Sequence, residues 1–301
     1  MAEATSTLDR RRILAAISTE IGQGQIAFST SARLALRVRN ALDDPDCVAS
    51  TVVSLIQAEP LLAARTVALA NSALFSRSGR VITDIPGAVA RVGFSVVRAL
   101  ATALVARQIA GAPTRPAYRD MAAALWEHTT HMAALAYVLA RRVTRQDPDT
   151  AMFAGLVHEV GGFYLISRAD EFPGLLDGGL ASDWMDDGEY DAEISGNAAI
   201  RSFESQIGNT ILEALSVPPT IVAAIETLWR GYLTLPPETL GDTLLLADRL
   251  VPVSSPFYRP PEGAAQRAAA TIDMAVEDET LTDVLKEAGA DVKALAAILR
   301  G

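Results

Sequence analysis

The sequence predicts an all-α protein. Apolar residues recur at helical spacing along most of the 301 residues, and the alternation of apolar and polar residues that marks strands is almost absent. Half of the residues are hydrophobic, so the chain can bury a sizeable core. Proline, glycine and acidic residues that start or stop helices separate the apolar segments.

The first half predicts a series of short helices. Thr7 is expected to cap the first, which ends near Gly22. Pro60 suits the first turn of a helix that stops near Asn71, and Thr83 or Asp84 can cap another that stops at Gly93. The expected helices span 8–21, 31–42, the Asp-Asp-Pro-Asp break to 58, 60–71, 84–93 and 95–109.

The second half begins after the break GAPTRP. A long amphipathic helix is expected around the stretch MAAALWEHTTHMAALAYVLARRV. Asp147, Pro148 and Asp149 form a strong start for the next helix. That helix is expected to contain the His158-Glu159 pair and, being apolar on nearly every side, to lie in the centre of the fold. The remaining expectations are an acidic loop at 177–193, helices at 193–215, 219–230 and 239–250, a linker from 253, and a tail of two or three short helices from 264.

Composition disfavours several classes of protein. A net charge of −10 opposes non-specific attraction to nucleic acid or to an anionic membrane. We find no uninterrupted apolar run of about 18 residues and no signal-peptide pattern, so we expect no membrane span and a cytoplasmic protein. Cys47 is the single cysteine, which excludes an internal disulfide and a cysteine-based zinc cluster; it is interpreted as a small buried thiol just inside a helix.

Four blocks carry a family resemblance. AEPLLAARTVALANSALF, ITDIPGAVARVGFSVVRAL, LWEHTTHMAALAYVLA and DTAMFAGLVHEVGGFYLI resemble, in order and spacing, the HDOD family, an output domain related to the HD phosphohydrolases. The resemblance covers about Gln25 to Leu250. It implies a bacterial signalling module without established catalytic activity, in which an N-terminal helical bundle packs on a degenerate HD-like helical subdomain. The domains it implies are an N-terminal helix at 1–24, halves at 25–112 and 113–252, and a linker with a helical tail at 253–301.

The resemblance also implies a vestigial metal site. The HD ligand set maps onto His128, the pair His158 and Glu159, and Asp248, with glutamate in place of the usual aspartate. We interpret these residues as a relic that holds helices together, because buried histidines and carboxylates commonly satisfy one another. No metal or other cofactor is therefore expected. His131, the third histidine, is interpreted as a helix residue outside the site.

Other motif residues favour structural roles. The end of the ANSALF helix is interpreted as a helix stop that sets the angle of the next element, since Asn tolerates left-handed backbone. The glycines suit tight turns and close packing. The residues in this structural set are Asn71, Ser72, Gly93, Gly155 and Gly161.

Three functions follow. The first is a non-catalytic signalling module that binds a protein partner or a small ligand, with the acidic loop and the tail as its variable parts. The second is a phosphohydrolase of the HD type that uses Mn, Fe or Mg on a nucleotide or cyclic dinucleotide. The third is DNA binding through a helix-turn-helix around Gly93; it ranks last, because the second helix offers only Ser95, Arg98 and Thr102 as polar residues before Arg107.

Overall fold

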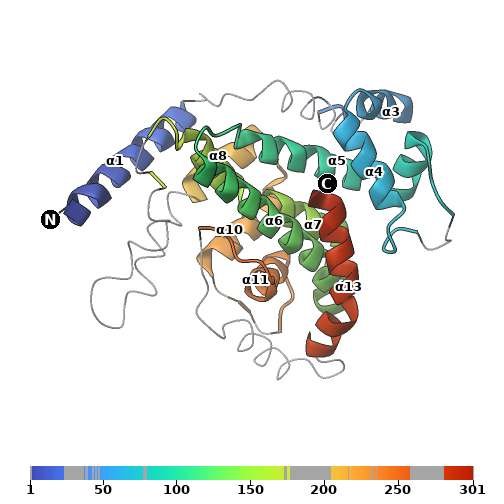
Figure 1. The fold of residues 1–301 in the computed structure, drawn as a ribbon. Coiled ribbons are helices and arrows are strands. Elements are labelled where there is room, and N and C mark those ends of the chain that lie inside the picture. The colour runs from blue at the N-terminus through green and yellow to red at the C-terminus, as the bar shows by residue number, and fades with distance from the viewer. Residues whose placement is uncertain are drawn as a thin grey trace.

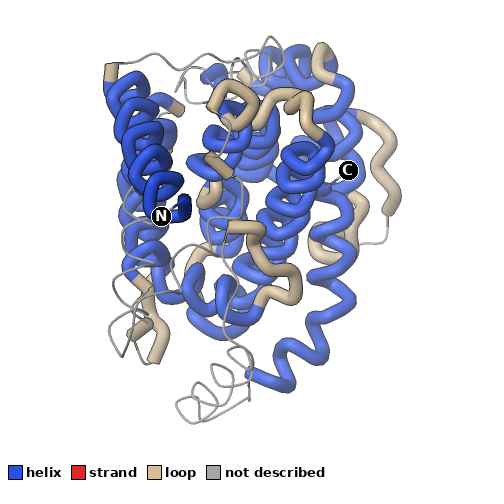
Figure 2. The backbone as a smooth tube through the Cα atoms, turned by 60° about the vertical axis from the view of Figure 1, so that its left-hand side comes forward, coloured by secondary structure: helices blue, strands red, loops and turns tan. Residues whose placement is uncertain are grey.

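The elements of the described part are all helices, and the predicted all-α class is confirmed (Figures 1 and 2). The computed structural model describes residues 2–23, 37, 40–42, 44, 46, 48–76, 80–172, 175–176, 205–215, 217–231, 233–234, 236–257 and 281–300. The acidic loop at 177–193, Cys47 and most of the helix expected at 31–42 lie outside these residues.

Two helices form the centre of the fold. Helix α6 (Pro116–Leu139) and helix α7 (Pro148–Val157) pack side by side, joined through a π-helical turn, η1 (Ala140–Thr144) (Figure 1). The predicted start of α7 is confirmed, since the Asp147 carboxylate accepts a hydrogen bond from the Thr150 amide. Residues 151–157 of α7 are buried, which agrees with the central position expected from its apolar surface.

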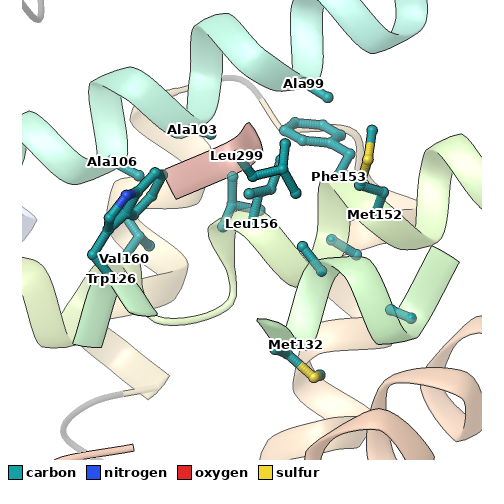
Figure 3. Packing of buried hydrophobic residues seen from close by; sticks show 14 of the residues in the cluster. Ala99, Ala103, Ala106, Trp126, Met132, Met152, Phe153, Leu156, Val160 and Leu299 are labelled. Carbon is teal, nitrogen blue, oxygen red and sulfur yellow. The ribbon is translucent and has the colours of Figure 1, made fainter. Parts of the chain in front are cut away.

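The α6–α7 contact depends on a glycine. A Cβ atom added at Gly155 would lie 2.7 Å from the Cα of Ala133, closer than side-chain carbons approach backbone. Only a residue without a Cβ therefore allows the two helices to approach this closely. Side chains from α5, α6, α7 and the last turn of α13 interleave around this contact, among them Ala103, Trp126 and Leu299 (Figure 3).

The first half of the chain packs against this centre. Helix α3 (Ala49–Gln57) and helix α4 (Pro60–Ala70) lie beside helix α5 (Ile85–Ile109) (Figure 1). Helix α5 in turn packs against α7 and α8. As predicted, Asp84 caps α5 by accepting from the Gly87 amide, and Gly93 breaks the helix with a left-handed φ of 83°. The two helices expected on either side of Gly93 are therefore the two arms of one kinked helix.

Helix α5 is long and apolar enough to cross a membrane by length and composition, the one such unbroken helix among the described residues. However, 67% of its most apolar window is buried inside the protein, as in a core helix. The same burial bears on the helix-turn-helix hypothesis. Thr102 is fully buried and donates to the Arg98 carbonyl, so it is not available to a DNA groove.

Two helix starts differ from the prediction. Helix α1 spans Ala2–Gly22, so Thr7 lies inside the helix instead of capping it; no glycine or proline in the first residues interrupts helix formation. Helix α3 begins at Ala49, later than the Asp-Asp-Pro-Asp break, and it has no side-chain cap.

The later helices agree more closely. Helix α8 (Val160–Arg168) follows α7, residues 205–214 are helical within the predicted 193–215, and helix α10 spans Pro219–Arg230 as expected. Helix α11 (Leu240–Leu250) starts one residue later than predicted because Thr239 is its cap. Thr239 and Asp242 form a reciprocal capping box.

The tail is not an appendage. Helix α13 is a single helix of 20 residues, Leu281–Arg300, where two or three short helices were expected from 264 onward; residues 264–280 lie outside the described part. It packs along α6 and against α4 (Figure 1, red). Its buried face is apolar and continuous with the core, and comprises Leu281, Val284, Ala288, Val292, Leu295, Ala296 and Leu299.

Candidate metal centre

Three potential metal ligands converge where α6 meets the end of α7. His128 lies on α6, His158 directly follows α7, and Glu159 directly precedes α8. One ligand atom from each lies within 4.8 Å of the others. The Nε2 atoms of the two histidines are 3.3 Å apart. Glu159 Oε1 lies 4.0 Å from His128 Nε2 and 3.9 Å from His158 Nε2. We call this group the histidine cluster.

A helix break orients the pair His158-Glu159. The sequence predicted one helix through both residues, and this is wrong: α7 ends at Val157, and Glu159 has non-helical dihedrals of φ −100° and ψ 20°. Adjacent residues of a continuous helix point about 100° apart around its axis. The break removes this angular constraint and lets the His158 and Glu159 side chains both face His128.

The Nδ1 atoms of both rings face backbone carbonyls. His128 Nδ1 lies 2.7 Å from the Val253 oxygen, and His158 Nδ1 lies 2.7 Å from the Gly155 oxygen. A carbonyl oxygen only accepts, so each Nδ1 carries the proton and donates. In the neutral ring the Nε2 atom then has a free lone pair directed into the cluster.

Burial keeps both rings neutral. It lowers the pKa of His128 to about 4, with His158 as a further cause, whereas Asp248 and the Val253 carbonyl act in the opposite direction. Burial likewise lowers the pKa of His158 to about 4, opposed by the hydrogen bond to Gly155. At neutral pH, two imidazole lone pairs therefore point at one another beside the Glu159 carboxyl group. This donor set fits a divalent cation such as Zn, Mn or Fe, which when bound would acidify a water molecule.

The cluster is closed to solvent. His128 is 1% exposed, His158 is 3% exposed, and the Glu159 side chain is 13% exposed. The segment 253–257, expected to be part of a linker, packs beside it. Val253 supplies the carbonyl to His128, and the buried Phe257 ring contacts Gly162 so closely that a Cβ there would lie 2.5 Å away. The first residues of the expected linker therefore belong to the surroundings of the histidine cluster.

The other candidate ligands lie outside the cluster. Asp248 on α11 does not join the three residues whose ligand atoms lie within 4.8 Å of one another, and it raises the pKa of His128 through its charge. His131 uses its Nδ1 to bond the Glu127 carbonyl of its own helix, 2.9 Å away, which agrees with its interpretation as a helix residue. The carbonyls of Val253 and Gly155 were not anticipated, and no sequence signal could reveal them, because every residue has a carbonyl.

The motif residues of the first half have structural contacts. Asn71 ends α4, as expected of a helix stop, and it does so in the right-handed region with a φ of −94°. Its side chain bonds both backbone groups of Ile82, at 2.8 Å and 2.7 Å, and thereby fixes the chain that leads into α5. Ser72 donates to the Leu69 carbonyl, and Gly161 is buried in the first turn of α8.

These features define an HD-like helical module, in which helices from distant parts of the chain bring two histidines and a carboxylate together. The family model of the HDOD domain matches residues 29–230, and the chain belongs to the HDOD family. The match lies within the resemblance expected over about 25–250. The domain boundaries inferred from the sequence stay a prediction.

Solved structures share the fold. A "Putative metal-dependent phosphohydrolase" from Shewanella amazonensis has a TM-score of 0.71 at 20% identity, covering 97% of this chain and 99% of that one. An HDOD domain protein with unknown function from Geobacter sulfurreducens has a TM-score of 0.56 at 19% identity, covering 94% and 96%. A "Putative signal transduction protein" from Marinobacter aquaeolei has a TM-score of 0.61 at 19% identity, covering 98% and 66%. No curated protein matches this chain.

Proposed function

We propose that this protein is a non-catalytic module of bacterial signal transduction that binds a protein partner or a small ligand. In this proposal the histidine cluster joins α6, the α7–α8 break and the segment 253–257, and it hydrolyses nothing. The proposed location is the cytoplasm, with neither a membrane nor a nucleic acid as partner. The family membership and the name of the Marinobacter aquaeolei neighbour support the signalling role.

The observation that carries the proposal is the burial of the cluster. A hydrolytic metal needs a vacant coordination position for water and room for a phosphate ester beside it. Here both histidines are at most 3% exposed, and the Val253 carbonyl bonds His128. Asp248, the fourth candidate ligand, is not among the residues whose ligand atoms lie within 4.8 Å of one another, so three donors face one another in a largely buried space. Such a site suits the joining of helices better than turnover.

A second function is favoured by the convergence of the three donors. A divalent metal such as Mn, Fe or Mg at this point would provide the centre of an HD-type phosphohydrolase acting on a nucleotide or cyclic dinucleotide. The name of the Shewanella amazonensis neighbour mentions a metal-dependent phosphohydrolase, and that name concerns that protein. This alternative requires water and a phosphate ester to reach the buried cluster.

The two functions are separated by metal content and turnover. The purified wild type is analysed for Mn, Fe and Zn and assayed with phosphodiester and nucleotide substrates, beside Glu159→Ala and a control variant, His131→Asn. We expect no turnover by any of the three proteins and a lower unfolding free energy for Glu159→Ala alone. Stoichiometric metal together with turnover that Glu159→Ala abolishes and His131→Asn retains would establish the phosphohydrolase instead.

A further inference from the structure

The C-terminal end of α13 lies against two arginines and a tryptophan, none of which belongs to the histidine cluster. Three hydrogen-bond donors converge on one oxygen, the carbonyl of Arg300. Arg65 of α4 donates from Nη2 at 2.8 Å, Arg107 of α5 donates from Nη1 at 3.3 Å, and Trp126 of α6 donates from Nε1 at 3.3 Å. We call Arg65, Arg107 and Trp126 the basic cage.

The three side chains of the basic cage contact one another. The guanidinium carbons of Arg65 and Arg107 lie 5.6 Å and 5.3 Å from the centre of the Trp126 ring, so both cations stack on one indole. Figure 3 shows Trp126 beside Ala106 of α5 and near Leu299, the residue before the bound carbonyl. Helices from three different parts of the chain thus hold the donors in place.

The charge in the cage is not balanced by its occupant. Two full positive charges meet a neutral carbonyl, to which the helix end adds only a partial negative charge. Burial lowers the pKa of Arg65 to about 10; Arg107 lowers it further, and Glu59 opposes this. The carbonyl has two lone pairs for three donors.

The deeper arginine also has an unused donor. Arg65 is 3% exposed, and its Nε atom has no hydrogen-bond partner within the described part of the chain. A buried donor without a partner is unfavourable by about 1–3 kcal/mol in typical proteins. Arg107, by contrast, is exposed, so the cage is open to solvent on that side.

We propose that the basic cage is an oxyanion-binding site, and that a carboxylate or phosphate bound there displaces the Arg300 carbonyl and releases the C-terminal end of α13. An oxyanion offers several acceptor oxygens to forked guanidinium donors and a full negative charge to neutralise them, which the carbonyl does not. The proposal goes beyond the proposed function, and it holds whether or not the histidine cluster binds a metal.

Outside the cage, the displaced end is held by the buried side chains of Leu295, Ala296 and Leu299 and by one exposed ion pair. The Arg300 side chain pairs with Glu127 at 2.7 Å, but the two side chains are 48% and 42% exposed, and such surface pairs contribute little. Release of the last turns would uncover the surfaces of α4, α5 and α6 around Arg65, Arg107 and Trp126. Binding of a small anion would in this way change a protein surface.

Hydrogen exchange along α13 tests the proposal. Wild type, Arg107→Gln and the control Arg142→Gln are titrated with inorganic phosphate, with acetate and, at matched ionic strength, with chloride. Arg142 is a suitable control because it also anchors α13, through Glu287 at 3.1 Å, but outside the cage. Circular dichroism verifies that the exposed substitutions leave the helix content unchanged.

We expect phosphate, acetate or both to accelerate exchange in the last two turns of α13 about tenfold, the factor that corresponds to one lost charge-assisted hydrogen bond. The control should respond like the wild type, and Arg107→Gln should not respond. A response to phosphate alone identifies phosphate as the ligand chemistry, and a response to acetate extends it to carboxylates. Equal effects of chloride, an unchanged response in Arg107→Gln, or no response in the wild type would each overturn the proposal.

Discussion

Acidification should destabilise this protein through its two buried histidines. In the unfolded chain both rings take up a proton as the pH falls below about 6.5. In the folded protein burial lowers the pKa of His128 and of His158 to about 4. The unfolded state therefore binds more protons between these values, so the free energy of unfolding is largest above pH 6.5 and decreases as the pH falls toward 4.

The size of the stability change follows from how far burial lowers each histidine pKa. One pKa unit corresponds to about 1.4 kcal/mol, so each neutral histidine contributes on the order of 3 kcal/mol at neutral pH. Typical domains have a total stability of about 5–15 kcal/mol, which makes loss of these contributions easy to detect. The protein should be close to unfolding at the acid end of this range.

Urea denaturation at a series of pH values measures the effect, with a chelator present in a parallel series to remove any bound cation. The matched variant is the double substitution His128→Asn and His158→Asn. The Asn amide can still donate to the Val253 and Gly155 carbonyls that the rings contact, but it does not titrate. Its stability should be lower at neutral pH and nearly independent of pH in this range.

His131→Asn is the control, since this residue lies outside the cluster and bonds its own helix. It should retain the pH dependence of the wild type. The reasoning fails if the wild type is equally stable throughout the range, or if the double variant loses stability with pH as steeply as the wild type does.

Two further predictions concern the packing that positions the cluster. Gly155→Ala should lower the free energy of unfolding by about 1–3 kcal/mol, because its Cβ would lie 2.7 Å from the Ala133 Cα, whereas Gly289→Ala, with nothing within 4 Å, should be neutral or stabilising in thermal melts. Equal melting shifts for the two glycine variants would contradict the close α6–α7 approach. Asn71→Ala should cost about 1–3 kcal/mol in urea titrations, because it leaves both backbone groups of Ile82 without their side-chain partner. A change below a few tenths of a kcal/mol would show that these bonds do not anchor the chain before α5.

Much of the fold could be predicted because its signals are local. Asp147 with Pro148 starts α7, Asp84 caps α5, and Gly93 breaks it, each through a hydrogen bond or a dihedral preference that involves residues a few positions apart. The convergence of His128 with His158 and Glu159 was implied by the family resemblance, and the structure brings these three side chains together.

The sequence by itself determined the all-α class and the starts of helices α4, α5, α7 and α10, and the family resemblance implied the three cluster residues together with Asp248. Tertiary structure alone decided that α7 breaks before Glu159, that the Val253 carbonyl orients His128, and that α13 docks in a cage containing Arg65. Helix signals are local and survive in the sequence because each involves only neighbouring residues. Contacts between residues more than a hundred positions apart depend on how whole helices pack, and a backbone carbonyl that any residue could supply leaves no mark in the sequence.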